Sequence, residues 1–273
     1  MRMRFNIALI GVLAYPTFAA ADDELKTADE VITKYIEAIG GRAKMDAVKT
    51  TRATGKSIMG GGMETPMTME QKRPKSMRVE FTFQGMTGIQ AFDGESGWFV
   101  MPFAGKTDPE KMPEEMVKIF ADQADMDGPL VDYAKKGHQI ELVGKDEVEG
   151  SSTYKLKVTK KSGDVEYHYL DADHYLPVQL TGEREIQGMP IEFKVTFGDY
   201  KEVGGMMLPH SMTQSGGPMG GNQLIIEKYE VNVDLPDERF QMPAPKPKEE
   251  TPPAGEAAPK EEKKPEKKDD GGK

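Results

Sequence analysis

The sequence contains no cysteine among its 273 residues. This absence excludes disulfide bonds, thiol nucleophiles, cysteine-held zinc sites and iron–sulfur clusters held by thiolates. It also removes the residue to which the lipid anchor of a bacterial lipoprotein is attached. We therefore expect a chain that folds by side-chain packing without covalent cross-links and carries no lipid anchor.

Long apolar runs are missing as well. The most apolar stretch near the N-terminus, Phe5–Phe18, is shorter than the roughly 20 residues that span a bilayer, and it contains Pro16. Two arginines precede this stretch and the small residues Ala19–Ala21 follow it. The pattern is that of a secretory signal peptide and disfavours the alternative of a membrane anchor. We predict a signal peptide at residues 1–21, cleaved near Ala21, and a periplasmic mature protein.

Positive charge is in short supply, since 36 Lys and Arg stand against 46 Asp and Glu, for a formal net charge of −10. Residues 244–273 hold eight lysines and eight acids but no aromatic or branched aliphatic residue. Such a segment cannot bury enough surface to offset its chain entropy. We predict a disordered Pro/Lys/Glu-rich tail there and one folded domain at residues 22–243. This domain is acidic, which excludes nucleic acid as a partner.

Motifs for catalysis and cofactor binding are also absent. The four histidines belong to no H-E-x-x-H or H-x-E pattern, and no G-x-S-x-G occurs. The glycine-rich stretch Gly216–Gly221 lies between two expected strands, whereas a phosphate cradle needs a helix N-terminus. Residues 123–134 resemble a calcium loop but end in Ala134 where the bidentate Glu belongs. We assign no catalytic residue, metal or cofactor, and predict that the protein is not an enzyme.

The hydrophobic pattern predicts one helix followed by many strands. Thr27 and Glu30 form a capping box, and apolar residues follow at helical spacing up to Ile39. From Thr51 onwards the period changes to two, with Gly, Asp or Asn in nearly every gap. Short links between strands make neighbouring strands antiparallel. One long interruption, between Pro109 and Gly137, carries two short helical patterns. The strands are expected at Thr51–Met59, Met63–Gln71, Ser76–Gln84, Thr87–Phe92, Trp98–Phe103, His138–Val143, Thr153–Thr159, Val165–Leu170, Leu176–Glu183, Ile191–Phe197, Met206–Gln214 and Leu224–Val233.

About a dozen strands with one apolar face present more surface than a few short helices can cover if the sheet is flat. The fold class that follows is mainly β: a single curled antiparallel sheet that forms an incomplete β-barrel with an N-terminal helix and a short helical lid. Such barrels often leave an apolar pocket at the mouth. A packed β-sandwich is the alternative, and periodicity does not separate the two.

Methionine is unusually common, with 19 residues in the chain. Its flexible, polarizable side chain suits surfaces that adapt to ligands of varied shape, but it fills irregular core gaps equally well. A third interpretation is copper, because Met63, Met67 and Met69, together with Met206–Met212 around His210, offer soft ligands. Strand parity places Met67 and Met69 on one face with apolar neighbours, which packing explains without a metal.

Four segments resemble the outer-membrane lipoprotein-sorting (LolA/LolB-like) superfamily. They are Tyr35–Gly41, Asp93–Trp98, Tyr169–Val178 and Asp199–Pro209. The resemblance spans nearly the whole domain, and the order and spacing of the segments carry it more than any one motif does. It implies an incomplete antiparallel β-barrel lidded by helices, whose apolar cavity receives acyl chains.

We therefore predict a non-enzymatic periplasmic carrier or binding protein for lipid or lipoprotein acyl chains, acting as a monomer, with inner- or outer-membrane envelope proteins as further partners. The residues predicted to line the cavity are Met77, Val79, Phe81, Phe83, Trp98, Ile191, Phe193 and Val195, and those of the lid are Met112, Met116, Ile119 and Phe120. The alternative is an envelope protein-interaction module that uses the sheet as a scaffold and the C-terminal tail as a docking segment. A hydrolase with an unrecognised site is the third possibility.

Overall fold

The computed structural model describes residues 24–244 except for residues 187 and 217–220. The predicted signal peptide, and the predicted tail beyond residue 244, lie outside the described residues. The helices are α1 (Ala28–Ala38), α2 (Arg42–Ala47), α3 (Glu114–Gln123) and α4 (Tyr133–Lys136), with short 3₁₀ turns at Pro102–Ala104 and Asp237–Arg239. None of these helices combines the length and the apolar character that crossing a bilayer requires.

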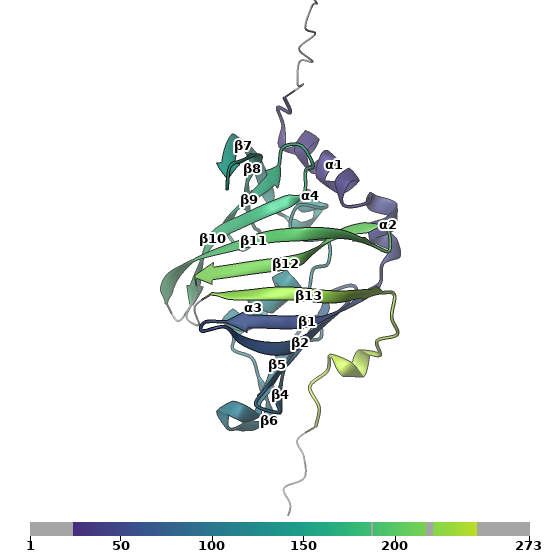
Figure 1. The fold of residues 1–273 in the computed structure, drawn as a ribbon, viewed down its shortest axis with the longest axis vertical. Helices are drawn as coiled ribbons and strands as arrows, with labels where there is room; N and C mark the ends of the chain where they lie inside the picture. The colour runs from purple at the N-terminus through teal and green to yellow at the C-terminus, as the bar shows by residue number, and fades with distance from the viewer. Residues whose placement is uncertain (1–23, 187, 217–220, 245–273) are drawn as a thin grey trace, which may run out of the picture.

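All thirteen strands belong to one antiparallel sheet (Figure 1). They are β1 (Thr50–Met59), β2 (Met63–Lys72), β3 (Ser76–Phe83), β4 (Met86–Phe92), β5 (Gly97–Met101), β6 (Lys106–Lys111), β7 (Gln139–Val148), β8 (Ser151–Thr159), β9 (Val165–Asp171), β10 (Pro177–Ile186), β11 (Met189–Val203), β12 (Met206–Gly216) and β13 (Asn222–Val231). This architecture confirms the predicted mainly β class with a single sheet, and the packed sandwich alternative is wrong.

The strand order is β6-β5-β4-β3-β2-β1-β13-β12-β11-β10-β9-β8-β7. The chain therefore enters the sheet at its centre with β1, meanders out to the edge at β6, and crosses to the opposite edge at β7. It then meanders back until β13 pairs with β1, where Thr51 faces Val231. Among the described residues β6 and β7 each pair with one strand only, so the sheet stays open.

Helix α1 begins where the sequence predicts. The Thr27 hydroxyl accepts a hydrogen bond from the Glu30 amide at 3.2 Å, and the Glu30 carboxylate accepts one from the Thr27 amide at 3.0 Å. The reciprocal pair satisfies two amide groups that the helix itself leaves unpaired. Val31 and Ile32 then bury the apolar stripe of α1 against Leu156, Val158 and Leu170 of the sheet.

The helices cover one face of the sheet, which we call the inner face. α1 packs on β8 and β9, α2 packs beside Met206 of β12, and α3 packs on β3 to β5. The segment that joins α3 to α4 crosses between these contacts and contributes Leu130 and Val131 to two of the clusters. The long crossover from β6 to β7 thus runs over the inner face and encloses space beneath it.

The C-terminal segment packs on the opposite, outer face. Leu235 and Phe240 are almost fully buried there. Arg239 donates a hydrogen bond of 2.8 Å to the buried carboxylate of Glu70, which also accepts one of 2.8 Å from Arg52. A buried carboxylate needs such partners because an unpaired charge is costly away from water. Residues 235–240 are therefore packed against the sheet.

Strand boundaries differ from the sequence expectations mainly at the edges. β6 was not expected, because Lys106–Lys111 is charged and shows no alternation of apolar and polar residues. Its Pro109 is tolerated because an edge strand leaves one row of amide groups unpaired. β11 is fifteen residues long and continues past Asp199, whose φ is 51°, to Val203. Residues 199–203 are mostly polar, so the apolar alternation of Ile191–Phe197 does not reveal this extension.

Candidate functional site

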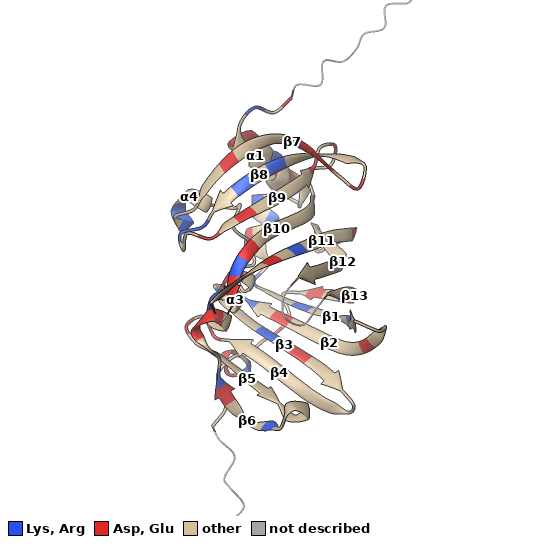
Figure 2. Cartoon of the chain, turned by 90° about the vertical axis from the view of Figure 1, so that its left-hand side faces the viewer, with Lys and Arg blue, Asp and Glu red and all other residues tan. Residues whose placement is uncertain are grey.

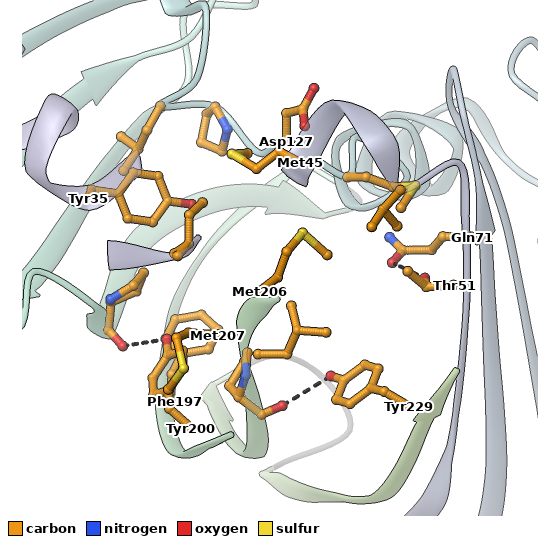
Figure 3. A pocket seen from close by; sticks show the side chains of 18 of the residues that line it. Tyr35, Met45, Thr51, Gln71, Asp127, Phe197, Tyr200, Met206, Met207 and Tyr229 are labelled. Atoms are coloured by element: carbon orange, nitrogen blue, oxygen red, sulfur yellow. Dashed lines mark hydrogen bonds between the residues drawn. The ribbon is translucent and has the colours of Figure 1, made fainter. Parts of the chain in front are cut away.

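An apolar cavity of about 350 Å³ lies between the inner face of the sheet and the helices (Figure 3). α1 and α2 and the segment after α3 form one wall, and strands from both halves of the sheet form the other. The lining residues are Tyr35, Ile39, Met45, Val48, Thr51, Met69, Gln71, Arg73, Met126, Asp127, Pro129, Leu130, His168, Pro177, Leu180, Phe197, Tyr200, Met206, Met207, Leu208, Pro209 and Tyr229. The volume falls within the range of small-ligand pockets.

Methionine and tyrosine give this cavity its character. Five methionines contribute to the wall, and Figure 3 shows the side chain of Met206 between the helical wall and Tyr229. The Tyr200 hydroxyl donates a hydrogen bond of 2.7 Å to the Pro177 carbonyl, and the Tyr229 hydroxyl donates one of 3.0 Å to the Pro209 carbonyl. Because these hydroxyls are paired with the backbone, the rings offer apolar surface to the cavity.

The tyrosines are neutral at any physiological pH. Burial raises the pKa of Tyr229 to about 12. Burial, together with the nearby Asp127 carboxylate, also raises the pKa of Tyr35 to about 12. Ionisation of either ring would place a negative charge in an apolar wall, which is unfavourable. The cavity therefore presents no anionic phenolate to a ligand.

An ion pair closes the cavity on the side of the β2–β3 turn. Arg73 donates two hydrogen bonds, of 2.8 and 2.6 Å, to the Asp127 carboxylate, and further ones to the carbonyls of Val48 and Met45 at 2.8 and 3.1 Å. Burial by itself would raise the pKa of Asp127, but the Arg73 guanidinium lowers it below the ordinary value. Arg73 thus fastens the crossover and the end of α2 to the sheet.

A buried charge cluster adjoins the cavity at β9. Lys160 donates hydrogen bonds of 2.6 Å to Glu166 and 2.7 Å to Asp122 of α3, and Arg184 lies 3.7 Å from Glu166. Burial alone would raise the pKa of Glu166, but the facing His168 ring and the Lys160 ammonium lower it to about 2. The cluster holds the end of α3 against β9 and β10.

His168 joins this cluster to the cavity. Its side chain is buried, and its Nε2 atom lies 3.5 Å from Glu166 Oε2 without the geometry of a hydrogen bond. Nε2 has no hydrogen-bond partner among the described residues. A buried nitrogen without a partner is unfavourable unless a ligand or water satisfies it. His168 is therefore the polar group in the wall with spare hydrogen-bonding capacity.

The residues predicted to line the pocket lie elsewhere. On β3, Met77 and Val79 pack beneath α3, and Phe81 and Phe83 pack against Phe103 with ring centroids 5.6 and 5.8 Å away. On β11, Ile191, Phe193 and Val195 share the face of Phe197, which does line the cavity. These residues thus cover the inner face between the cavity and the far ends of the strands.

Trp98 is on the other face. Its strand partner is Ala91, which pairs with Arg78, so Trp98 lies over the outer face beneath the C-terminal segment. Its side chain is 2% exposed and its indole nitrogen donates a hydrogen bond of 2.7 Å to the Phe240 carbonyl. A two-residue period shows which residues of a strand share a face, but it does not show which face is the inner one. The pairing with Ala91 places Trp98 on the outer face, away from the cavity.

The predicted lid residues are in and before α3. Met112 precedes the helix and is buried with Phe120 in the cluster that contains Met77, Phe92 and Phe99, while Met116 packs at its margin. Ile119 is half-buried. α3 therefore forms a packed cover over β3 to β5, next to the cavity. Its movement as a lid stays a prediction.

Sequence reasoning missed most of the true lining, although signals for it were present. Tyr35 and Ile39 belong to the N-terminal helix motif, and Tyr200 with Met206–Pro209 belongs to the glycine-containing turn motif. Both motifs contributed to the family resemblance, but their residues were interpreted as residues that form turns and not as residues that line a cavity. The structure confirms that chemistry elsewhere: Asp93 accepts hydrogen bonds from the Glu95 and Ser96 amides in its turn. Motif position, rather than strand periodicity, marks the cavity.

Metal ligands do not converge in the described part of the chain. Over residues 24–244, leaving aside the five undescribed positions, no three His, Asp or Glu side chains gather as a metal site would need. The copper interpretation offered Met63, Met67 and Met69, and Met206–Met212 around His210, as soft ligands. His210 is on β12, whereas Met67 and Met69 are on β2, three strand spacings or about 14 Å along the sheet.

Comparison with known proteins extends the structural description. No family model and no curated protein sequence matches the chain. Solved structures do match. A protein domain from Vibrio parahaemolyticus assigned to outer membrane lipoprotein sorting is similar over 78% of this chain and 97% of its own, with a TM-score of 0.54 and 15% identity. The fold is LolA-like.

Two further structures agree on the LolA-like fold. A LolA superfamily protein from Nitrosomonas europaea is similar over 80% of this chain and 98% of its own, with a TM-score of 0.54 and 13% identity. A DUF1329 family protein from Desulfovibrio piger is similar over the same shares, with a TM-score of 0.56 and 13% identity. At such identities the likeness concerns the backbone fold alone.

Proposed function

We propose that the protein is a periplasmic, non-enzymatic carrier or binding protein for the acyl chains of lipids or lipoproteins, and that these chains occupy the cavity beneath α1 and α2. The observation that carries the proposal is the cavity itself, about 350 Å³ of space walled by methionine and by tyrosine rings whose hydroxyls are paired with the backbone. Burial of an acyl chain contributes roughly 0.8 kcal/mol per CH₂ to the free energy of binding. Such a ligand is held without a charged anchor.

The methionines suit a carrier of varied chains. Met45 comes from α2, Met126 from the segment between α3 and α4, and Met206 and Met207 from β12, so the wall changes shape by rotation of unbranched side chains. The LolA-like fold supports this assignment, because one similar structure is assigned to lipoprotein sorting. On this proposal inner- or outer-membrane envelope proteins deliver and receive the cargo, and the carrier acts as a monomer.

His168 supplies a partner for the polar end of the cargo. His168 lines the cavity from β9, and its buried Nε2 atom has no hydrogen-bond partner among the described residues, with Glu166 Oε2 3.5 Å away. An ester or amide group at the head of an acyl chain would satisfy this nitrogen directly or through one water. The variant His168→Leu is expected to bind an acyl ester several-fold more weakly, while its affinity for an alkane of equal length stays unchanged.

The decisive experiment is native mass spectrometry of the protein purified from periplasm, with analysis of extracted lipid, followed by calorimetry of delipidated protein with a long-chain fatty acid. We expect co-purified acyl lipid and saturable binding. Met207→Trp fills the cavity without adding charge and is expected to weaken binding about tenfold. Met86→Trp, at an exposed turn, is the matched control. Absence of acyl binding by both methods contradicts the proposal, and turnover of model esters would favour a hydrolase.

A reporter can be placed inside the cavity because the chain has a single tryptophan. In the double variant Trp98→Phe and Phe197→Trp, the only indole lies in the cavity wall. Acyl ligand displaces water from around that ring, so we expect a saturable blue shift of its emission. The wild-type Trp98, buried under Phe240, is expected to remain silent in the same titration.

A further inference from the structure

The exposed large apolar side chains of this protein gather at one end of the sheet. Four such residues occur among the described residues: Met63, Met86, Val143 and Met189. Met63, Met86 and Met189 stand at the β1–β2, β3–β4 and β10–β11 turns. Antiparallel pairing puts these three turns at the same end of the strands, and Figure 1 shows the β1–β2 and β10–β11 turns at the left of the sheet. Val143 is on the edge strand β7.

These turns also lack charge. The four tips at β1–β2, β3–β4, β5–β6 and β10–β11 contain no Asp, Glu, Lys, Arg or His; they are residues 57–63, 81–88, 101–105 and 188–191. Figure 2 is viewed from this end of the sheet. The tip of the β3–β4 hairpin is tan there, the colour of residues other than Lys, Arg, Asp and Glu. We call these four tips the rim. The rim ends at the β8–β9 turn, which carries Lys160, Lys161 and Asp164.

The opposite ends of the strands are charged. The strand ends and turns there include Lys72–Lys75, Asp93–Ser96, Asp146–Glu149 and Asp171–His174, each with at least two ionisable residues, whereas the β11–β12 turn at Gly204–Gly205 has none. The whole chain has a formal net charge of −10. A high content of charged residues does not by itself place those residues at one end of the strands. The asymmetry singles out the rim as the end that can leave water without burying a charge.

Two apolar tracks connect the rim with the cavity along the inner face. On β11, side chains two residues apart run from Phe197 in the cavity wall to Met189 at the rim. On β2 the track runs from Met69 in the cavity wall through Met67 to Met63. Side chains at this spacing share one face of a strand. Along the β2 track a ligand that leaves the cavity reaches the rim without passing a charged side chain of that strand, whereas on the β11 track the Arg184 guanidinium lies 4.0 Å from the ring centroid of Phe193.

We propose that the rim is a docking surface for a lipid bilayer, into whose headgroup region the methionine-bearing tips insert. This deepens the proposed function, on which the role of the tracks rests. A bilayer fits the rim better than a protein partner does, because the tips form a row of separate turns in which glycine and methionine are the commonest residues, and they lack the Arg and Trp anchors of protein interfaces. The half-buried rings of Phe81, Phe83 and Phe103 stand directly behind the tips, at the depth where aromatic groups settle in membranes.

The acidic body predicts an unusual lipid dependence. Most peripheral proteins bind anionic membranes better because basic residues attract them. Here the charge outside the rim is repelled by an anionic surface, so we expect stronger binding to phosphatidylcholine vesicles than to vesicles containing phosphatidylglycerol. Salt screens this repulsion and is expected to raise binding to the anionic vesicles.

The test uses flotation of delipidated full-length mature protein with phosphatidylcholine vesicles. The triple variant Met63→Gln, Met86→Gln, Met189→Gln keeps the net charge and alters only exposed side chains, and we expect it to lower the bound fraction about tenfold. Val143→Gln, the exposed apolar residue outside the rim, is the matched control and is expected to bind as the wild type does. Equal loss in both variants contradicts the proposal.

A second measurement reports position. Because the chain has no cysteine, Met63→Cys and Val143→Cys each give one site for an environment-sensitive dye. Vesicles are expected to shift the emission of the dye at residue 63 to the blue and to leave that at residue 143 unchanged. A shift at both sites, or no flotation of wild-type protein, overturns the rim proposal. Calorimetric binding of soluble fatty acid, measured without vesicles, then still supports the proposed function.

Other occupants of the rim give other results. Light scattering of vesicle-free protein that shows a dimer, lost in the triple variant, would assign the rim to a second copy of the chain and overturn the bilayer proposal. Monomeric protein that floats with vesicles through the rim supports it.

Discussion

The indole nitrogen of Trp98 donates a 2.7 Å hydrogen bond to the backbone carbonyl of Phe240, a residue 142 positions further along the chain. Arg78 lies over the same indole at 5.6 Å from its ring centroid and donates to the Arg239 carbonyl at 2.9 Å. The outer face of β3 and β5 therefore holds the C-terminal segment by buried, directed contacts. The segment closes the domain on the side away from the cavity.

Truncation of Phe240 should destabilise the domain strongly. Its side chain is 1% exposed, and Phe240→Ala leaves a cavity over Trp98. We expect a loss of about 3 kcal/mol in the free energy of unfolding, measured by urea titration, together with a red shift of the Trp98 emission. Gln241→Ala, at an exposed neighbour, is expected to change neither. A Phe240→Ala protein as stable as the wild type would mean that the segment is only loosely attached.

Removal of the tail beyond residue 243 should have no effect on folding. Its composition offers no residue that could join the core. A chain ending at Pro243 is expected to melt within a few degrees of the full mature protein, because it keeps Leu235 and Phe240. A chain ending at Asp234 loses both buried residues and is expected to melt well below it. Calorimetric scans of the three chains separate these outcomes.

Acid should destabilise the protein through Glu166. The pKa of this carboxyl is about 2 in the folded protein, whereas its ordinary value is 4.5. A group with a lowered folded pKa stabilises the protein fully above the ordinary value and loses that contribution as pH falls towards the folded value. We expect on the order of 2 to 3 kcal/mol to be lost between about pH 5 and pH 2. Glu166→Gln should flatten this part of the stability curve, and an unchanged slope would contradict the assignment.

The pair formed by Arg73 and Asp127 should couple the crossover to the sheet. In a double-mutant cycle with Arg73→Met and Asp127→Asn, we expect a coupling of about 2 kcal/mol in the free energy of unfolding, because each single change leaves a half-buried partner. Hydrogen exchange of the amides between α3 and α4 should speed up in both single variants. Lys34 and Glu37, an exposed pair on α1, provide the control cycle, with an expected coupling below about 0.5 kcal/mol.

The sequence predicts the fold class well because its alternation and turn residues are local signals. The capping box at Thr27 and the strands on either side of Asp93 appear where expected, and short links made the sheet antiparallel. β6 was missed because an edge strand needs no apolar face. The full length of β11 was missed because the apolar alternation stops at Phe197, before Asp199, Lys201 and Glu202.

The candidate site was harder to predict because it depends on which elements meet in space. Met77 and Phe197 belong to equally regular strands, but α3 covers the first and the cavity lies beside the second. Trp98 has the parity of the outer face, which is set by its pairing with Ala91. The pairing of Arg73 with Asp127 joins residues 54 positions apart, and no local pattern marks it.

The central pairing of β1 with β13 has a consequence for how the chain assembles. Thr51 and Val231 are 180 positions apart, whereas almost all other strand neighbours are adjacent in sequence. Each meander can form from local hairpins, but joining them requires the slow closure of a very long loop. A nick in the crossover would divide the protein into two fragments, each with its own meander, that meet at the β1–β13 pairing and are also held together by α1, α2 and the C-terminal segment. If the two fragments reassemble when they are mixed, the protein can be used as a split protein with its division in the crossover.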